Sequence, residues 1–423
     1  MSDLQQEDSY NLASVKLTNT WGHETQIGYM IEGIDIYESV FTNGTKGSIV
    51  ISDNIGLIES LPFLGEETIE IDFYVWEGDN YTKTFNVYSI ESVDIVKGNM
   101  KTYILNFISS EVELNKNTRI SKAWKGVTND EIVSDIFTDF SMSIFYAEPC
   151  ITSSRLVVPN WTPFRTMQWL AENSVTENGA SDIVFYENKY GWWWQSLSKM
   201  KEKKHAAFLH YLGFKEKTNN NRNSIRTLSA PQLFNTFNNT KGGLYGSTTY
   251  NHSIINKSLV TNYLYAGAEE RIMESSKLGK NPPMANRGLP DNFEEDKLHT
   301  NSSKISDALS DLSTFKGKLD YQSVDPETVY HKKEHNLMRD STLQGMNTQI
   351  INVEVAGDPG RMCGNPITLM VGSMMDNIKG AQEIDDLYSG VYLMTAIHHS
   401  LTKENYTQII ELRSDSIDRK VGE

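Results

Sequence analysis

The sequence of 423 residues lacks the long apolar run that a membrane-spanning helix requires. Such a helix takes about 20 consecutive, mostly apolar residues, whereas the densest apolar cluster is the triplet Trp192, Trp193 and Trp194. The first eight residues, MSDLQQED, are polar and acidic, unlike a signal peptide, which combines basic residues with an apolar segment. We therefore expect no insertion into a membrane.

Cysteine is scarce as well, with Cys150 and Cys363 as the two residues of this type. They lie far apart and lack the short spacing of a zinc site. We expect two reduced thiols in a protein made in a cytoplasm. Cys150 together with distant histidines is too unspecific a pattern to assign a nucleophile.

Basic residues are outnumbered, because 39 Lys and Arg stand against 55 Asp and Glu, for a net charge of −16. The imbalance is concentrated in residues 1–113, which hold 5 basic and 19 acidic side chains and thus carry −14 of the total. Stable nucleic-acid binding requires a basic surface, so we do not expect it from these residues. On charge alone, a solvated and solubilising surface explains the acidic excess.

The chain has a β pattern at both ends. In residues 10–113, Ile69, Ile71, Phe73 and Val75 alternate with Thr, Glu, Asp and Tyr, which is the period of a half-buried strand. Further strands are expected at 47–53 and 103–107, separated by turns that contain Gly and Asn. Short strands at this spacing predict a small barrel or sandwich.

The middle of the chain, residues 114–205, is predicted to be α+β. Thr128 to Glu131 form a capping box for a helix with Ile132, Ile136 and Phe140 on one face. Thr162 and Pro163 predict the start of a second helix. A hairpin then follows, with strands near 183–186 and 192–194.

The remaining segments are less regular until the β pattern returns. Residues 219–245 are rich in Asn, Gly and Thr, and the Pro-rich residues 274–301 indicate a long exposed loop. We expect a helix with Ile305, Leu309 and Leu312, and another over 326–343. From Gln349 onward, strands are expected at 351–355, 367–371, 391–399 and 408–412.

The two β regions end in similar hairpins. Val87-Tyr88 precedes a return strand that ends at residues 105–107, and Val391-Tyr392 precedes one that ends at residues 410–412. This similarity would follow from one barrel that occurs twice with an α+β insert between the copies. Hairpins also resemble one another through their common geometry, so duplication remains one of two explanations.

One string fits a catalytic motif, His331-Lys332-Lys333-Glu334-His335, which matches H-x-x-E-H. Two His at i and i+4 share a helix face and can bind zinc, with the Glu as general base. Zinc helices normally line a buried cleft, whereas charged residues surround this motif. A solvated helix face is therefore the preferred interpretation, with a zinc metallopeptidase as the alternative.

Other candidate sites are weaker. His398 and His399 are neighbours on an expected strand and so point to opposite faces, which excludes a shared metal. The segment 242–246, GGLYG, lacks the Lys-Ser/Thr of a phosphate-binding loop. The Trp triplet could form a glycan-binding face around Trp193, although aromatic residues in a hairpin more often build a core or an interface. We therefore assign no catalytic, cofactor-binding or metal-binding residues.

Several short motifs, in order along nearly the whole chain, resemble the central baseplate hub protein of contractile-tailed bacteriophages such as the T4-like phages. The motifs are IDIYES (34–39), GSIVI (47–51) and LPFLGEE (61–67) for the first barrel; VPNWTPF (158–164), FYEN (185–188) and the Trp strand from Gly191 for the insert; and GDP (357–359), GNPITL (364–369), GVY (390–392), His398, Tyr406-Thr407 and Glu411-Leu412 for the second barrel. Residues 246–345 match least.

The resemblance implies an α+β, mainly β fold with two similar small barrels, an α+β insert and helical or loop segments. The implied domains are 1–113, the first and acidic barrel; 114–218, the insert; 219–270, the start of the second barrel with connecting strands; 271–345, a long Pro- and Gly-rich loop with helices; 346–415, the completion of the second barrel; and 416–423, a tail. Three chains would form a ring of six barrels, which offers a pseudo-six-fold face to a tail tube and a three-fold face to a spike. DNA would pass through the ring, and acidic walls would keep it from binding stably.

The resemblance also implies a structural, non-enzymatic protein without a cofactor, made in the host bacterial cytoplasm and carried in the virion. Its implied partners are two further copies of the chain, a tail spike or spike-lysozyme protein, and tube or tube-initiator proteins. Baseplate wedge proteins and the tape-measure protein complete this set. The spike-base hub of a related contractile injection system remains an alternative.

Overall fold

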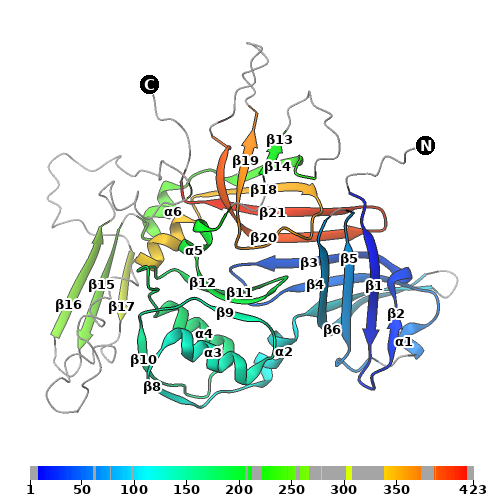
Figure 1. Ribbon diagram of the computed structural model, residues 1–423, viewed down its shortest axis with the longest axis horizontal. Helices are drawn as coiled ribbons and strands as arrows, with labels where there is room; N and C mark the ends of the chain where they lie inside the picture. The colour runs from blue at the N-terminus through cyan, green and yellow to red at the C-terminus, as the bar shows by residue number, and fades with distance from the viewer. Residues whose placement is uncertain are drawn as a thin grey trace, which may run out of the picture.

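The computed structural model describes most of the chain and is mainly β, as predicted (Figure 1). The described residues are 8–60, 63–76, 78–96, 100–204, 208–211, 222–244, 246–253, 258–265, 278, 302–306, 338–372, 385 and 387–416. Among them, no helix is long and apolar enough to cross a membrane.

The largest sheet has 13 strands. They are β1 (Asn11–Thr18), β2 (Glu24–Gln26), β3 (Ile31–Ser39), β4 (Lys46–Asp53), β5 (Thr68–Tyr74), β6 (Asn80–Val96), β7 (Met100–Ile108), β13 (Phe208–Tyr211), β14 (Ile225–Gln232), β18 (Gln349–Ala356), β19 (Pro366–Val371), β20 (Gly390–Thr402) and β21 (Tyr406–Ser414). We call β1–β7 the first half-sheet and the other six strands the second half-sheet. Antiparallel pairing of β3 with β20 joins the two, so β14, β18, β21, β20, β3 and β4 lie side by side (Figure 1).

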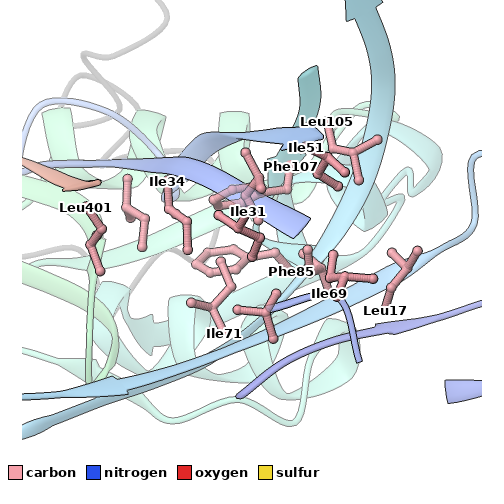
Figure 2. Packing of buried hydrophobic residues seen from close by; sticks show 14 of the residues in the cluster. Leu17, Ile31, Ile34, Ile51, Ile69, Ile71, Phe85, Leu105, Phe107 and Leu401 are labelled. Atoms are coloured by element: carbon pink, nitrogen blue, oxygen red, sulfur yellow. The ribbon is translucent and has the colours of Figure 1, made fainter. Parts of the chain in front are cut away.

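The first half-sheet curves around its own core. The alternation predicted for β5 is confirmed, because Ile69, Ile71 and Phe73 are fully buried. Side chains from β1 and β3–β7 meet them there, and Leu401 of β20 joins the same cluster (Figure 2). The expected strands at 47–53 and 103–107 are confirmed as β4 and β7.

The order of strands in the first half-sheet recurs in the second. The order β5-β6-β7-β4-β3 corresponds to β19-β20-β21-β18-β14, and every neighbouring pair in both series is antiparallel. One β-bulge in each pair also corresponds: the β6–β7 register shifts between Val87 and Ser89, and the β20–β21 register shifts between Met394 and Ala396. The similarity noted in the sequence is thus one of pairing, not of a hairpin alone.

Residues 110–202 connect the half-sheets and surround a further core. They form α2 (Ser110–Asn117), β8 (Ala123–Thr128), α3 (Asn129–Phe140), β9 (Phe145–Ala147), β10 (Ser153–Val157), α4 (Pro163–Glu172), β11 (Ile183–Asn188), β12 (Gly191–Ser196) and α5 (Leu197–Glu202). The remaining elements are η1 (Gly28–Met30), α1 (Leu57–Ser60), α6 (Thr236–Lys241), a helix at 338–345, and a small sheet of β15 (Gly246–Ser253), β16 (Ser258–Tyr265) and β17 (Ser302–Ser306). The core of the connecting segment packs α3 and α4 against the β11–β12 hairpin.

Local predictions had mixed outcomes. Thr162 caps α4, its hydroxyl accepting from the Arg165 amide, as predicted. The capping box at α3 is wrong in its chemistry: Thr128 is the N-cap residue, but its side chain makes no capping hydrogen bond. The α3 terminus is instead fixed by tertiary contacts, since the Asn129 amide nitrogen donates to Thr152 O at 2.9 Å.

The predicted helix around Ile305 is also wrong. Ile305 lies in strand β17, opposite Tyr250 of β15 in a parallel pair, so strand pairing overrode the helical spacing; Leu309 and Leu312 lie outside the described residues. The helix expected over 326–343 is described at 338–345. Apart from Leu278, the Pro-rich residues 274–301 lie outside the described part of the chain.

Candidate functional site

The most distinctive site is a cluster of buried polar side chains where the connecting segment meets both half-sheets, which we call the polar junction. Its members are Glu38, Tyr81, Lys83, Glu187, Lys189, Arg361, His399, Tyr406 and Gln408. Each lies in a hairpin, strand or loop at the border between two hydrophobic cores.

Glu187, at the end of β11, fastens the connecting segment to the first half-sheet. Its carboxylate forms an ion pair with Lys83 Nζ at 2.8 Å and accepts hydrogen bonds from the Thr45 amide nitrogen at 2.7 Å and from the Ser109 hydroxyl. Lys83 also donates to Thr45 Oγ1 at 3.0 Å. The charge of Glu187 is thus fully compensated inside the protein, as burial of a carboxylate requires.

Lys189, in the turn of the same hairpin, reaches both half-sheets. Its Nζ donates to Pro359 O at 3.2 Å, in the loop after β18, and lies 3.9 Å from Asp79 Oδ2, in the loop between β5 and β6. Burial lowers the pKa of Lys189, and the nearby Asp79 and Asp358 oppose that effect. One hairpin turn therefore holds together loops that lie far apart in sequence.

Arg361 organises the second half-sheet side of the junction. Its Nη1 donates to Ala356 O and to Gln408 Oε1, both at 2.7 Å, and its Nη2 donates to Arg222 O at 2.7 Å. The Gln408 amide nitrogen donates in turn to Asp358 O and to the Tyr406 hydroxyl, each at 2.9 Å. Burial is the main influence on Arg361 and lowers its pKa.

His399 and Glu38 face each other diagonally across the β3–β20 joint. His399 Nδ1 lies 2.7 Å from the Tyr406 hydroxyl, and the Tyr81 hydroxyl donates to Glu38 Oε1 at 3.5 Å. Desolvation raises the pKa of Glu38 to about 7, with Lys83 opposing, and lowers the pKa of His399 to about 3, with His398 adding to the effect. Burial thus favours the neutral form of both side chains.

The polar junction is suited to holding parts together rather than to catalysis. Its charged groups are engaged with backbone and side-chain partners that come from three parts of the chain. Within the described residues, no group of three or more His, Cys, Asp and Glu is placed to hold a metal ion. The arrangement therefore fixes the relative positions of the connecting segment and the two half-sheets.

The sequence analysis missed this junction, although one signal was present. Glu187, Asn188 and Lys189 are polar residues at the end of a strand that is otherwise apolar, and every residue of β11 is buried. A charged residue in a buried hairpin has to find a partner, but the sequence does not say that Lys83 supplies it.

The candidate residues from the sequence are dispersed. His331, Glu334 and His335 lie outside the described residues. His398 points away from His399, as predicted: His398 Nε2 lies 2.7 Å from Asp35 Oδ1 and its ring stacks on Tyr37. Gly242 and Gly243 belong to the turn after α6.

The cysteines and the Trp hairpin belong to the interior. Cys150 and Cys363 are free and buried, as expected for reduced thiols, and burial raises the pKa of Cys150 to about 12. The hairpin is confirmed, and Trp192 and Trp194 are 1% and 0% exposed in the core of the connecting segment. Trp193 packs on the opposite side against the second half-sheet and donates to Asn188 Oδ1 at 2.9 Å. The preferred interpretation of the Trp triplet, that it builds a core, is confirmed for Trp192 and Trp194.

Known proteins similar to this chain match it over nearly its whole length. No protein-family model matches it. The chain is 22% identical over 407 residues to the "Probable baseplate hub protein gp334" of Vibrio phage KVP40, a match that covers 91% of this chain and 90% of that protein.

Two solved structures of tail proteins have a fold similar to that of this chain. The tail protein from Neisseria meningitidis MC58 matches with a TM-score of 0.57 and 12% identity, covering 96% of this chain and 97% of that one. The 43 kDa tail protein of prophage MuSo2 from Shewanella oneidensis matches with a TM-score of 0.54 and 11% identity, covering 96% and 100%. The resemblance of this chain to the baseplate hub proteins of phage tails is thereby confirmed.

Proposed function

We propose that this chain is the hub of a phage tail baseplate, in which three copies form a ring that adapts a six-fold tail tube to a three-fold spike. The observation that carries the proposal is the recurring strand order, in which five strands of each half-sheet pair in the same sequence with corresponding bulges. Two equivalent units per chain let three chains present six equivalent positions to a tube. The similarity to a phage baseplate hub protein over nine-tenths of both chains supports it.

The half-sheets are, in this proposal, the two barrels, and the connecting segment is the insert. The proposed domains keep the boundaries expected from the sequence, 1–113, 114–218, 219–270, 271–345, 346–415 and 416–423. The partners are a tail spike or spike-lysozyme protein, tube or tube-initiator proteins, wedge proteins and the tape-measure protein. The chain serves as a structural component of the virion and has no catalytic role.

DNA would cross the ring without stable binding. One face of the joined sheet carries a row of small polar side chains from four adjacent strands, Ser48, Asp35, Ser400 and Thr407. This row has no Lys or Arg, and its one carboxylate, Asp35, lies 2.7 Å from His398 Nε2 on the same face. A carboxylate at this position disfavours stable binding of phosphate. Part of the −14 charge is meanwhile structural, because the buried Asp53 and Glu67 accept hydrogen bonds from nearby backbone amides.

The proposal is tested by the mass of the purified chain in solution, alone and with a spike protein from a contractile-tailed phage. A trimer in either sample is expected, together with a stable complex of three chains and one spike. A chain that stays monomeric with the spike, or forms a dimer or tetramer, would contradict the proposal.

A further inference from the structure

Pairing with β3 covers one edge of β20, and the equivalent edge of β6 has no partner among the described strands. The matched bulges make β6 the counterpart of β20, with Val87 at the position of Met394 and Ser89 at that of Ala396. In β20, the residues after this bulge pair with β3, from Ala396 opposite Ser39 to Thr402 opposite Gly33. In β6, the residues after the bulge pair with β7 alone among the described strands.

The exposure of side chains on the two edges reflects this difference. Tyr88, Val93 and Ile95 of β6 are 55%, 52% and 74% exposed. Their counterparts Thr395, His399 and Leu401 of β20 are 0%, 1% and 1% exposed, and His399 and Leu401 lie in the stretch of β20 that pairs with β3. The β6 edge therefore has the apolar character of a joint without the strand that would complete it.

The chain also has a strand equivalent to β3, because β14 occupies the position of β3 in the repeated strand order. Both strands carry a bulge at the same place, between Ile31 and Gly33 in β3 and between Ile225 and Thr227 in β14. In the described residues, β14 pairs with β18 on one side and has no strand on the other. Among the described strands, each chain thus has one unpaired β3-like edge and one unpaired β20-like edge.

A second match between these two edges is independent of the repeat. Relative to β3, strand β14 has one additional residue between Ser229 and Gln232. Relative to β20, strand β6 has one additional residue between Glu91 and Asp94, where Ser92 adopts a φ of 53°. These insertions fall at the positions of Ile36 and His399, which are directly opposite each other in the existing joint.

We infer that β14 of one copy pairs antiparallel with β6 of the next copy, in the geometry of the β3–β20 joint. Because the insertions face each other, one register serves the whole joint, with Ser229 opposite Asp94, Leu228 opposite Ile95 and Gln232 opposite Glu91. From Thr227 opposite Val96 to Leu233 opposite Ile90, three pairs are apolar, namely Leu228 with Ile95, Ala230 with Val93 and Leu233 with Ile90, and none opposes like charges. The inference rests on the proposed trimer: three such joints between chains alternate with three β3–β20 joints within chains and close one continuous sheet.

The test is disulfide formation between copies of a Ser229→Cys/Asp94→Cys variant. Both positions are exposed, so the substitutions leave each chain folded, and the native Cys150 and Cys363 are buried. Residues directly opposite each other in an antiparallel pair bring their Cβ atoms close enough for a disulfide, whereas residues two positions out of register do not. The matched control is Ser229→Cys/Ser92→Cys, and Leu228→Cys/Ile95→Cys checks the neighbouring position.

On oxidation, we expect the band on a non-reducing gel to shift from one chain to three for both in-register pairs and to stay at one chain for the control. A variant that is a trimer by mass but cross-links no more than the control would overturn the joint and leave the proposed hub intact. A chain that remains monomeric with and without a spike protein would overturn both.

Discussion

Glu187 and Lys83 form an ion pair at 2.8 Å although their side chains are only 4% and 12% exposed. The pair joins the hairpin of the connecting segment to the first half-sheet, and its neighbours Thr45 and Ser109 complete the hydrogen bonding of the carboxylate. Buried pairs of this kind contribute little net stability but are costly to break. We therefore expect the pair to determine which surfaces of the connecting segment and the first half-sheet pack together.

Removing one partner of this pair is expected to destabilise the chain strongly. Lys83→Met leaves the Glu187 carboxylate buried without its cation, which costs about 3–5 kcal/mol. Lys16→Met, at the partly exposed pair with Glu70, is the control and costs at most about 1 kcal/mol. Urea unfolding measures both, and equal losses would contradict a structural role for Glu187 and Lys83.

Stability should depend on pH through Glu38 and His399 in opposite directions. The pKa of Glu38 is raised from 4.5 to about 7, so the folded state holds a proton that the unfolded state has lost, and stability falls as pH rises from 4.5 to 7. The pKa of His399 is lowered from 6.5 to about 3, so the unfolded state binds the additional proton, and stability rises from pH 3 to 6.5. Between pH 4.5 and 6.5 the two effects cancel.

The variant Glu38→Gln separates the two effects. It removes the decrease with pH, so the free energy of unfolding should rise by about 1.4 kcal/mol per pH unit between pH 4.5 and 6.5, where the parent is nearly flat. Urea unfolding at several pH values measures the slope. An unchanged profile would show that Glu38 is ionised in the folded chain.

The sequence predicts the strands of this fold better than it predicts their partners. The alternation in β5 depends on side chains within seven residues, and the structure confirms it. The β3–β20 joint brings together residues more than 350 positions apart, such as Asp35 and His398, and no local pattern encodes that contact. The polar junction escaped prediction for the same reason.

The repeated hairpins illustrate the limit on register. Residue types suggest that Val87 is equivalent to Val391. The positions of the bulges show instead that Val87 is equivalent to Met394, three residues later. The return strands agree: Phe107 pairs with Val87 and Leu412 with Met394. A bulge changes the register without changing composition, so strand pairing is needed to detect it.

Core aromatic residues should be far more sensitive to truncation than exposed ones. Trp194→Ala, at a fully buried position whose Nε1 donates to Met167 O at 3.3 Å, is expected to cost about 3–5 kcal/mol. Trp21→Ala, at a position that is 61% exposed, is the matched control and should cost less than about 1 kcal/mol. Comparable losses in thermal unfolding would contradict the assignment of the Trp hairpin to the core.

One glycine is required by its close approach to the polar junction. A Cβ atom on Gly357 would lie 2.1 Å from the Tyr406 ring, whose hydroxyl contacts His399 and Gln408. Gly357→Ala should therefore cost about 1–3 kcal/mol through overpacking. Gly372→Ala, where a Cβ meets nothing within 4 Å, should leave the melting temperature nearly unchanged, and a similar decrease for both variants would contradict this packing.

The claim that three chains form a hub is tested most directly by class-averaged electron microscopy of the purified chain with its spike partner. A ring of three chains with six lobes and a central hole is the predicted result, because each chain contributes two half-sheets with the same strand order. A closed particle of another symmetry without an axial hole would contradict the account.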